Sequence, residues 1–140
     1  MIREAVSGDY IDICKICCDN LGYNCSAELI KERIENLDSE HERVFVAVAD
    51  NKVVGFVHAE KFNTLYYESM VNIQGLAVAK EYCKNGLGRA LMESVENWAR
   101  ECNVSLIRLN SGFERKEAHG FYRAIGYDNE KEQIRFMKRL

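Results

Sequence analysis

The chain has 140 residues, of which 47% are hydrophobic and 29% charged, and its formal net charge is −3. This length is enough to bury one hydrophobic core, so we expect a single domain over residues 1–140. The basic residues are scattered and no apolar run could cross a bilayer, which excludes a broad nucleic-acid surface and a membrane-spanning segment. A cytoplasmic location is the default expectation, because the first residues lack the apolar stretch of a signal peptide.

The first half of the chain is predicted to begin with a strand at Ile2–Val6 and a helix at Asp9–Leu21. Ser26 is suited to cap a second helix. Two β-branched and aromatic runs follow, "RVFVAVAD" and "KVVGFVHAE", and Asp50 and Asn51 between them tolerate positive φ. These two runs therefore predict a hairpin.

The second half alternates between strand and helix patterns. An apolar strand is expected at Val71–Ala79, then a long amphipathic helix, then a short strand at Ser105–Asn110, an order that predicts a right-handed crossover between parallel strands. A last helix at Glu114–Ile125 and a closing strand near Gln133–Lys138 complete the expected elements. The fold class predicted is a mixed α+β protein with one central sheet. In the long helix, the apolar stripe predicted to face that sheet is Leu87, Leu91, Val95, Trp98 and Cys102.

A glycine pair, Gly86 and Gly88 in "CKNGLGRAL", precedes the long helix. The P-loop pattern GxxxxGK[ST] is absent, and the dinucleotide fingerprint fails because Leu91 stands where its third glycine should be. The glycines still allow a sharp turn, and the amides of residues 85–89 together with the helix N-terminus are suited to an anion. An ordinary strand-to-helix loop is the alternative for this segment.

Two blocks of sequence resemble the GCN5-related N-acetyltransferase family. The first, "LAVAKEYCKNGLGRAL" from Leu76 to Leu91, resembles the acetyl-CoA motif of that family, and the second, "LNSGFERKEAHGFYRAIGY" from Leu109 to Tyr127, resembles its "A-x-x-FY-x-x-x-GF" segment. The resemblance covers essentially the whole chain. It implies a single N-acetyltransferase domain with a mixed, mostly antiparallel sheet, flanking helices and a splayed parallel strand pair.

The resemblance also implies a binding site for acetyl-CoA as co-substrate, with no metal. The backbone around Ala77, at Leu76 and Val78, would pair with the pantetheine arm, and Asn110 would hydrogen-bond the cofactor. Cys83 stands where the family usually has Arg or Gln, so the pyrophosphate would depend mainly on backbone amides. The implied cradle residues are Lys84, Asn85, Gly86, Leu87, Gly88 and Arg89.

Catalytic roles follow from the resemblance only in part. Tyr122 occupies the position of the general acid that protonates the departing thiolate, although its helical spacing is also that of a core residue. Asn72 stands where some members carry a glutamate base, and an amide cannot accept a proton at neutral pH. Glu68, Gln74 through a water molecule, and Glu114 remain open as the base.

The acceptor is expected to be a small-molecule or peptide amine, and no nucleic-acid or membrane partner is expected. Phe62, Tyr66 and Tyr67 lie between the hairpin and the next strand, where they would line an acceptor pocket, cover the sheet or form a subunit contact. A monomer and a homodimer both remain open. A non-catalytic acyl-CoA-binding sensor or regulatory module is the alternative to an enzyme.

Six cysteines raise the question of a metal or redox site, and the densest cluster is "CKICC" at Cys14, Cys17 and Cys18. A structural zinc site would need a second pair or suitably spaced histidines, whereas Cys25 stands apart in the sequence. We therefore expect no metal and interpret the cysteines as reduced, small apolar residues. A metal or redox module built on "CKICC" is the remaining alternative.

Overall fold

The structure is a computed structural model that describes all of residues 1–140. The chain forms two compact units, Met1–Leu109 and Asn110–Leu140, and each is described by itself below. The expectation of a single domain over residues 1–140 stays a prediction.

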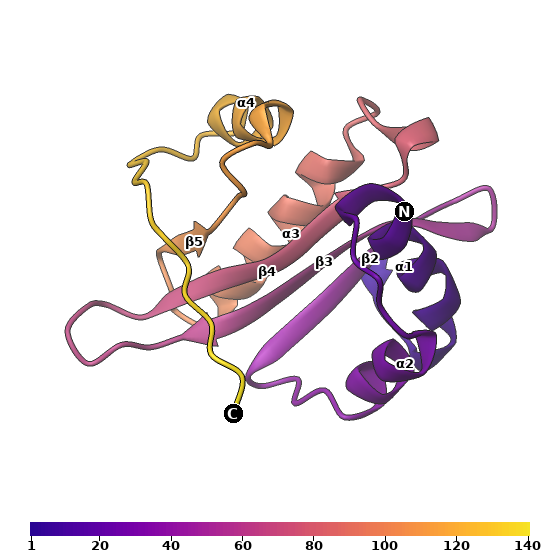
Figure 1. The fold of residues 1–140 in the computed structure, drawn as a ribbon, viewed down its shortest axis with the longest axis horizontal. Coiled ribbons are helices and arrows are strands. Elements are labelled where there is room, and N and C mark those ends of the chain that lie inside the picture. Colours follow the sequence, from indigo (N-terminus) through magenta and orange to yellow (C-terminus); the bar gives the residue numbers. More distant parts are fainter. The chain divides into compact units, whose positions relative to one another are not determined.

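The first unit is built on a five-stranded sheet with the strand order β1-β2-β3-β4-β5 (Figure 1). Strands β1 to β4 are antiparallel to their neighbours, and β4 and β5 are parallel, as the crossover pattern predicted. The mixed α+β fold class is therefore confirmed. The strands are β1 (Ile2–Glu4), β2 (Glu42–Ala49), β3 (Lys52–Phe62), β4 (Met70–Val78) and β5 (Ile107–Leu109).

The β2–β3 hairpin forms where the sequence predicted it. Asp50 and Asn51 both have positive φ, 52° and 61°, which is the conformation that a tight turn between twisted strands requires. In β3 the residues from Val53 to Val57 are all buried, and Val46, Val57 and Ala59 are completely buried. The hairpin thus supplies the centre of the sheet.

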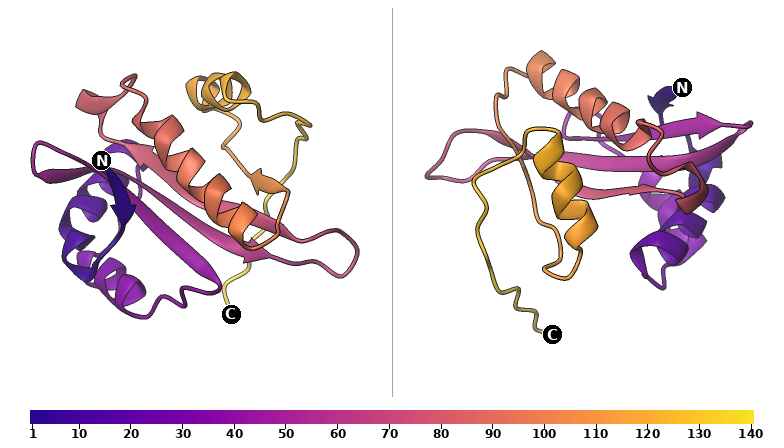
Figure 2. Two further views of the ribbon diagram at one scale, coloured as in Figure 1. Left: turned by 180° about the vertical axis from the view of Figure 1, so that it is seen from behind. Right: turned by 90° about the horizontal axis from the view of Figure 1, so that it is seen from above.

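Helices cover both faces of this sheet (Figure 2). One face carries α1 (Tyr10–Ile16), a π-helical turn at Cys17–Leu21, and α2 (Ala27–Glu35), whose first turn is capped by Ser26 Oγ accepting from the Leu29 amide at 3.3 Å. The other face carries α3 (Leu87–Glu101). The predicted stripe of α3 is largely confirmed, since Leu91, Met92, Val95, Trp98 and Ala99 are buried and Leu87 and Cys102 are partly so. Trp98 is a core residue, as its spacing indicated.

A partly buried ion pair ties the first strand to the first helix. The Arg3 guanidinium donates to both carboxylate oxygens of Asp9 at 2.8 and 2.9 Å, and the Val6 amide donates to the same carboxylate at 2.8 Å. The Arg3 hydrogen bonds hold the pKa of Asp9 below its ordinary value, although burial opposes that shift. The carboxylate therefore stays ionised at neutral pH and anchors the start of α1.

The second unit contains α4 (Lys116–Ala124) and a tail without regular structure. Gly126, at a φ of 100°, ends the helix: its amide bonds the Arg123 carbonyl and the Tyr127 amide bonds the Tyr122 carbonyl, the Schellman pattern. The closing strand predicted at Gln133–Lys138 is wrong. Ile134, Phe136 and Met137 in this tail are at least 80% exposed, and alternation alone does not make a strand without a neighbour to complete its backbone hydrogen bonds.

Candidate active site

The parallel strands β4 and β5 pair over only part of their length. Three residue pairs join them, ending at Ile73 and Leu109, so the last residues of β4 have no strand neighbour on that side. The β3–β4 register also shifts beside His58, where Gln74 is left without a partner, and such a bulge bends the strand. The splayed parallel pair that the resemblance implied is thus present as an open edge beyond Ile73.

Backbone direction shows which groups lie on this open edge. The Ala79 amide donates to Val54 of β3 at 2.7 Å, and neighbouring residues of a strand point their polar groups to opposite sides. Ala77 therefore faces β3, where it pairs with Phe56, while Leu76 and Val78 direct their N–H and C=O groups to the open edge. An extended ligand arm would find the hydrogen-bonding pattern of a missing strand there.

One backbone carbonyl on that edge already accepts hydrogen bonds from two side chains. The Val78 carbonyl accepts from Asn20 Nδ2 at 3.1 Å and from Cys83 Sγ at 3.5 Å. The Cys83 thiol also reaches the Ala79 carbonyl at 3.6 Å, so this residue closes the turn after β4 and faces carbonyl oxygens. The N–H and C=O of Leu76 and the N–H of Val78 are the groups left to pair with a ligand.

The N-terminus of α3 lies a few residues further along the chain. Gly86 is its N-cap, with a φ of 79° and no side-chain hydrogen bond to the first turn, and the first turn contains no acidic residue. Gly86 O accepts from Ala90, so the amides of Leu87, Gly88 and Arg89 precede the first intrahelical bond. These unbonded donors and the helix dipole make the turn suited to an anion, as the glycine pair predicted.

Charged groups around this turn are exposed. Lys84 and Gly86 both have left-handed backbone conformations, with φ values of 67° and 79°. Asn85, which lies between them, is exposed. Arg89 forms an ion pair with Glu93 at 3.3 Å on the helix surface. Backbone amides, rather than a buried cation, are therefore the main anion donors of this turn.

Tyr122 lies on α4 in the second unit, against Phe121 and Tyr127 in edge-to-face contacts with ring centroids 5.2 and 6.1 Å away. Burial raises its pKa above the ordinary value, while the nearby Arg115 opposes the shift. The phenol therefore keeps its proton at neutral pH, which is the state that a proton donor needs. Asn110, the other predicted residue of this unit, is exposed at its first position.

The residues predicted as possible bases are exposed. Glu68 accepts from Ser105 at 3.4 Å, Gln74 is exposed at the bulge of β4, and Glu114 is an exposed residue of the second unit. Asn72, at the usual glutamate position, accepts from the Arg108 guanidinium at 2.8 Å, so its amide is fixed on the sheet.

Sequence reasoning missed a histidine–carboxylate pair on the sheet. His58 Nε2 lies 2.7 Å from Glu42 Oε1, and both side chains are partly buried. His58 is opposite Gly75 in the register, directly beside the bulge, and two residues from Phe56, which packs in the core under α1. The pair therefore lies on the α1 and α2 face, next to the point where β4 opens. No sequence signal joined these residues, because they are 16 positions apart and come together only through strand register.

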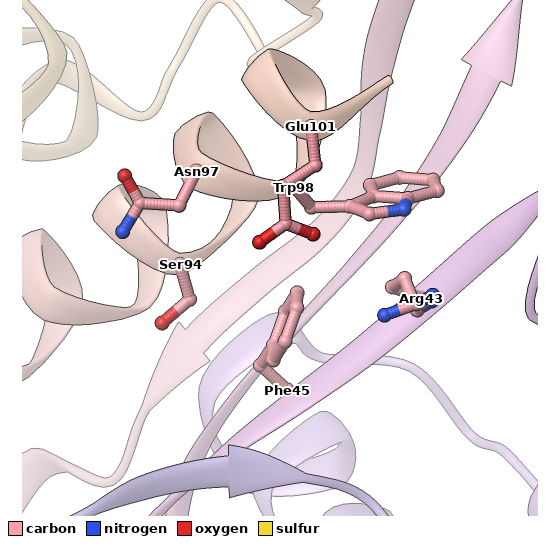
Figure 3. A pocket seen from close by; sticks show the side chains of 6 residues that line it. All are labelled: Arg43, Phe45, Ser94, Asn97, Trp98 and Glu101. Atoms are coloured by element: carbon pink, nitrogen blue, oxygen red, sulfur yellow. The ribbon is translucent and has the colours of Figure 1, made fainter.

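Two other features do not form part of this site. Tyr66 and Tyr67 are 87% and 59% exposed at the tip of the β3–β4 loop, so they line no pocket in the unit. A hollow of about 230 Å³ lies on the opposite face of the sheet from His58, away from the first turn of α3 (Figure 3). It is smaller than ordinary ligand pockets, and its floor carries the Arg43–Trp98 contact. The residues that line it are Arg43, Phe45, Ser94, Asn97, Trp98 and Glu101.

Three of the six cysteines lie close together in the structure. Cys25, which stands apart in the sequence, lies with its sulfur 3.9 Å from both Cys14 and Cys18. Burial raises the pKa of Cys14 to about 11 and that of Cys17 to about 12. Protonated thiols are poor nucleophiles, which argues against a thiol-dependent reaction at Cys14 or Cys17.

The chain belongs to the Acetyltransferase (GNAT) family, whose profile matches residues 10–127. It is 26% identical over 112 residues to an aminoglycoside N(6')-acetyltransferase type 1 of Stenotrophomonas maltophilia, covering 76% of this chain and 73% of that protein. It is 24% identical over 141 residues to an aminoalkylphosphonate N-acetyltransferase of Salmonella typhimurium, covering 99% and 90%.

Solved structures show the same fold. A transcriptional regulator from Bacillus halodurans C-125 superposes with a TM-score of 0.85 at 21% identity, covering 99% of each chain. AAC(6')-Iy in complex with the bisubstrate analog CoA-S-monomethyl-acetylneamine superposes with a TM-score of 0.83 at 18% identity, covering 100% of this chain and 98% of that one. No helix of the present structure is both long and apolar enough to span a membrane.

Proposed function

We propose that this protein transfers the acetyl group of acetyl-CoA to a primary amine of a small-molecule or peptide acceptor, by direct attack through a tetrahedral intermediate. The observation that carries this proposal is the open edge of β4 at Leu76 and Val78, together with the N-terminus of α3 in the same unit, where no side chain caps the first-turn amides. An extended pantetheine arm fits the first feature and a pyrophosphate fits the second.

Each group of the site has a role in this proposal. Acetyl-CoA supplies the acetyl group as a thioester that is open to attack by an amine. Leu76 and Val78 hold the pantetheine arm through their backbone, and an amide near Leu76 stabilises the developing oxyanion. The α3 amides hold the pyrophosphate, and Tyr122 gives its proton to the departing thiolate, a role carried over from the family segment.

The remaining step is removal of a proton from the acceptor ammonium, and we assign it to His58. An alkylamine with a pKa near ~10.4 pays roughly 4–5 kcal/mol to expose its lone pair at neutral pH, so a base is needed. Histidine is a common general base in enzymes, and the Glu42 carboxylate, 2.7 Å from His58 Nε2, fixes the orientation of the ring. Glu42 and Glu60 on the same sheet face also favour a cationic acceptor.

One experiment tests both the binding of acetyl-CoA and the chemical class of the acceptor amine. Isothermal titration with acetyl-CoA should show binding. Thiol release is then measured in the same sample against an aminoglycoside, an aminoalkylphosphonate, a polyamine and a peptide with a free N-terminus, and it should occur with one amine class. Binding without release would support a non-catalytic acyl-CoA-binding sensor instead, and absence of binding would contradict the cofactor site.

A cytoplasmic location is also part of the proposed function.

Replacing Gly86 with valine should weaken acetyl-CoA binding by about 10-fold. The reason is that a β-branched residue at a φ of 79° costs roughly 1–3 kcal/mol and distorts the turn that directs the α3 amides, and each 1.4 kcal/mol lost from binding is about tenfold in Kd. Titration calorimetry measures the change. Asn103→Val is the matched control, because Asn103 also has a left-handed φ, 58°, and follows the C-terminus of α3, at the opposite end of the helix from Gly86. Equal affinity in Gly86→Val and wild type would show that the glycine turn is only a connection.

A further inference from the structure

The strongest feature outside the proposed acetyl-transfer site is the group of three sulfurs from Cys14, Cys18 and Cys25, here called the thiol cluster. The three Sγ atoms all lie within 4.8 Å of one another, and Cys25 is 3.9 Å from each of the other two. No other group of His, Cys, Asp or Glu side chains in the chain gathers three such ligand atoms. The acetyl-transfer chemistry proposed above does not use it.

Local backbone geometry creates the thiol cluster. Cys14 lies on α1 and Cys18 on the π-helical turn that continues it, so they are four positions apart and both sulfurs lie on one side. Gly22, in left-handed conformation, ends the π-helical turn, and the Tyr23 amide bonds back to the Cys17 carbonyl at 3.2 Å. The chain thereby reverses and returns Cys25 to the sulfurs of the preceding helix. A π-helical turn is rare and is frequent at functional sites.

Two of the three sulfur separations match those of a zinc site. Zinc binds thiolates at about 2.3 Å in tetrahedral geometry, which places neighbouring sulfurs about 3.8 Å apart. Cys25 Sγ lies 3.9 Å from each of the other two sulfurs and the third separation is within 4.8 Å, so small side-chain movements would bring all three around one ion. A disulfide bond between the same sulfurs would require the pair to approach to about 2.05 Å, and it would leave the third thiol unused.

We propose that Cys14, Cys18 and Cys25 bind one zinc ion, with water in the fourth position. Three Zn–S bonds form as three S–H bonds break and their protons pass to solvent, and nothing is oxidised or reduced. Three thiolates are soft ligands, which suit zinc, and Cys18 is exposed, which leaves a path for the ion and for its water ligand.

The zinc ion would brace the segment that reaches the proposed cofactor edge. Asn20, inside the π-helical turn, donates to the Val78 carbonyl at the end of β4. Fixing Cys14, Cys18 and Cys25 around one ion holds that turn against α1 and so holds Asn20 in place. The zinc site itself is independent of the acetyl-transfer proposal, since its readout is bound metal and not activity.

The test begins with reduced protein of residues 1–140 that is loaded with zinc, passed through metal-free buffer and measured for zinc per chain. Wild type should retain one zinc ion, and substitution by cobalt should give the thiolate-to-metal charge-transfer band and the ligand-field bands of tetrahedral coordination. Cys14→Ser and Cys25→Ser should bind zinc at least about 100-fold more weakly, since loss of even an outer-shell partner costs 10- to 100-fold. Cys102→Ser is the matched control, because Cys102 follows α3 and is not part of the cluster.

Thermal unfolding of wild type with and without zinc keeps the proposal testable if a variant fails to fold. A binding site in the folded state raises Tm when zinc is added and lowers it again when a chelator is added. No retained zinc in wild type, an unchanged Tm, or equal loss of zinc in Cys102→Ser would overturn the proposal. A disulfide-linked peptide of Cys14 and Cys25 in protein whose thiols were blocked at cell lysis would also overturn it.

Discussion

Replacing Tyr122 with phenylalanine should lower kcat by about 10²-fold while the affinity for acetyl-CoA changes little. The substitution removes only the hydroxyl, so the edge-to-face contacts of the ring with Phe121 and Tyr127 remain and α4 should keep its packing. Steady-state kinetics with the acceptor found in the panel, together with titration of acetyl-CoA, separate the two quantities. Equal kcat in variant and wild type would remove the acid role from Tyr122.

The pH dependence gives this prediction a second readout. Burial raises the pKa of Tyr122, so the phenol carries its proton at every pH below that raised value and loses it only above. The loss of kcat should therefore be the same from neutral pH to about pH 9, because the donor is fully protonated over that range. Tyr127→Phe is the matched control: it removes a hydroxyl from the neighbouring ring and should leave kcat close to that of wild type.

His58→Gln should lower kcat/KM by about 10²-fold at neutral pH. The reason is that the proposed base takes the proton of the acceptor ammonium. Glutamine retains a polar group toward Glu42 but cannot accept the proton. Raising the pH supplies free amine from solution, so the difference between variant and wild type should become smaller as the pH rises.

Two variants complete this test. His41→Gln is the control, since His41 lies 3.7 Å from Glu60 at the same end of the sheet but is half exposed. It should leave kcat/KM close to that of wild type. Glu42→Gln keeps His58 but removes the carboxylate that holds its ring nitrogen, so it should lower kcat/KM by less than His58→Gln does. A kcat/KM in His58→Gln equal to that of wild type would assign the base to another residue.

Much of the fold was predictable because its signals are local. Ser26 caps α2, Asp50 and Asn51 form the hairpin turn, and Gly86 takes the left-handed conformation before α3, each because of the chemistry of that residue itself. The buried stripe of α3 follows directly from helical periodicity. The family was also recognisable, since its two motif blocks are contiguous stretches of sequence and the profile match includes both.

One local prediction failed for a reason that applies to strands in general. The residues near Gln133–Lys138 alternate as a strand would, but a strand is completed only by hydrogen bonds to a neighbour. A helix satisfies its own backbone, which explains why the helices were predicted more securely than this segment.

Up to α4, the sequence by itself therefore determined the order of the main helices and strands, and it also determined the glycine turn and the membership in the acetyltransferase family, because each depends on residues that are close together along the chain. Tertiary structure alone decided which backbone groups of β4 face an open edge, and it paired His58 with Glu42 and brought Cys25 to Cys14 and Cys18. Those outcomes depend on strand register, a bulge and the reversal of the chain at Gly22. None of these leaves a pattern that composition, spacing or periodicity could show.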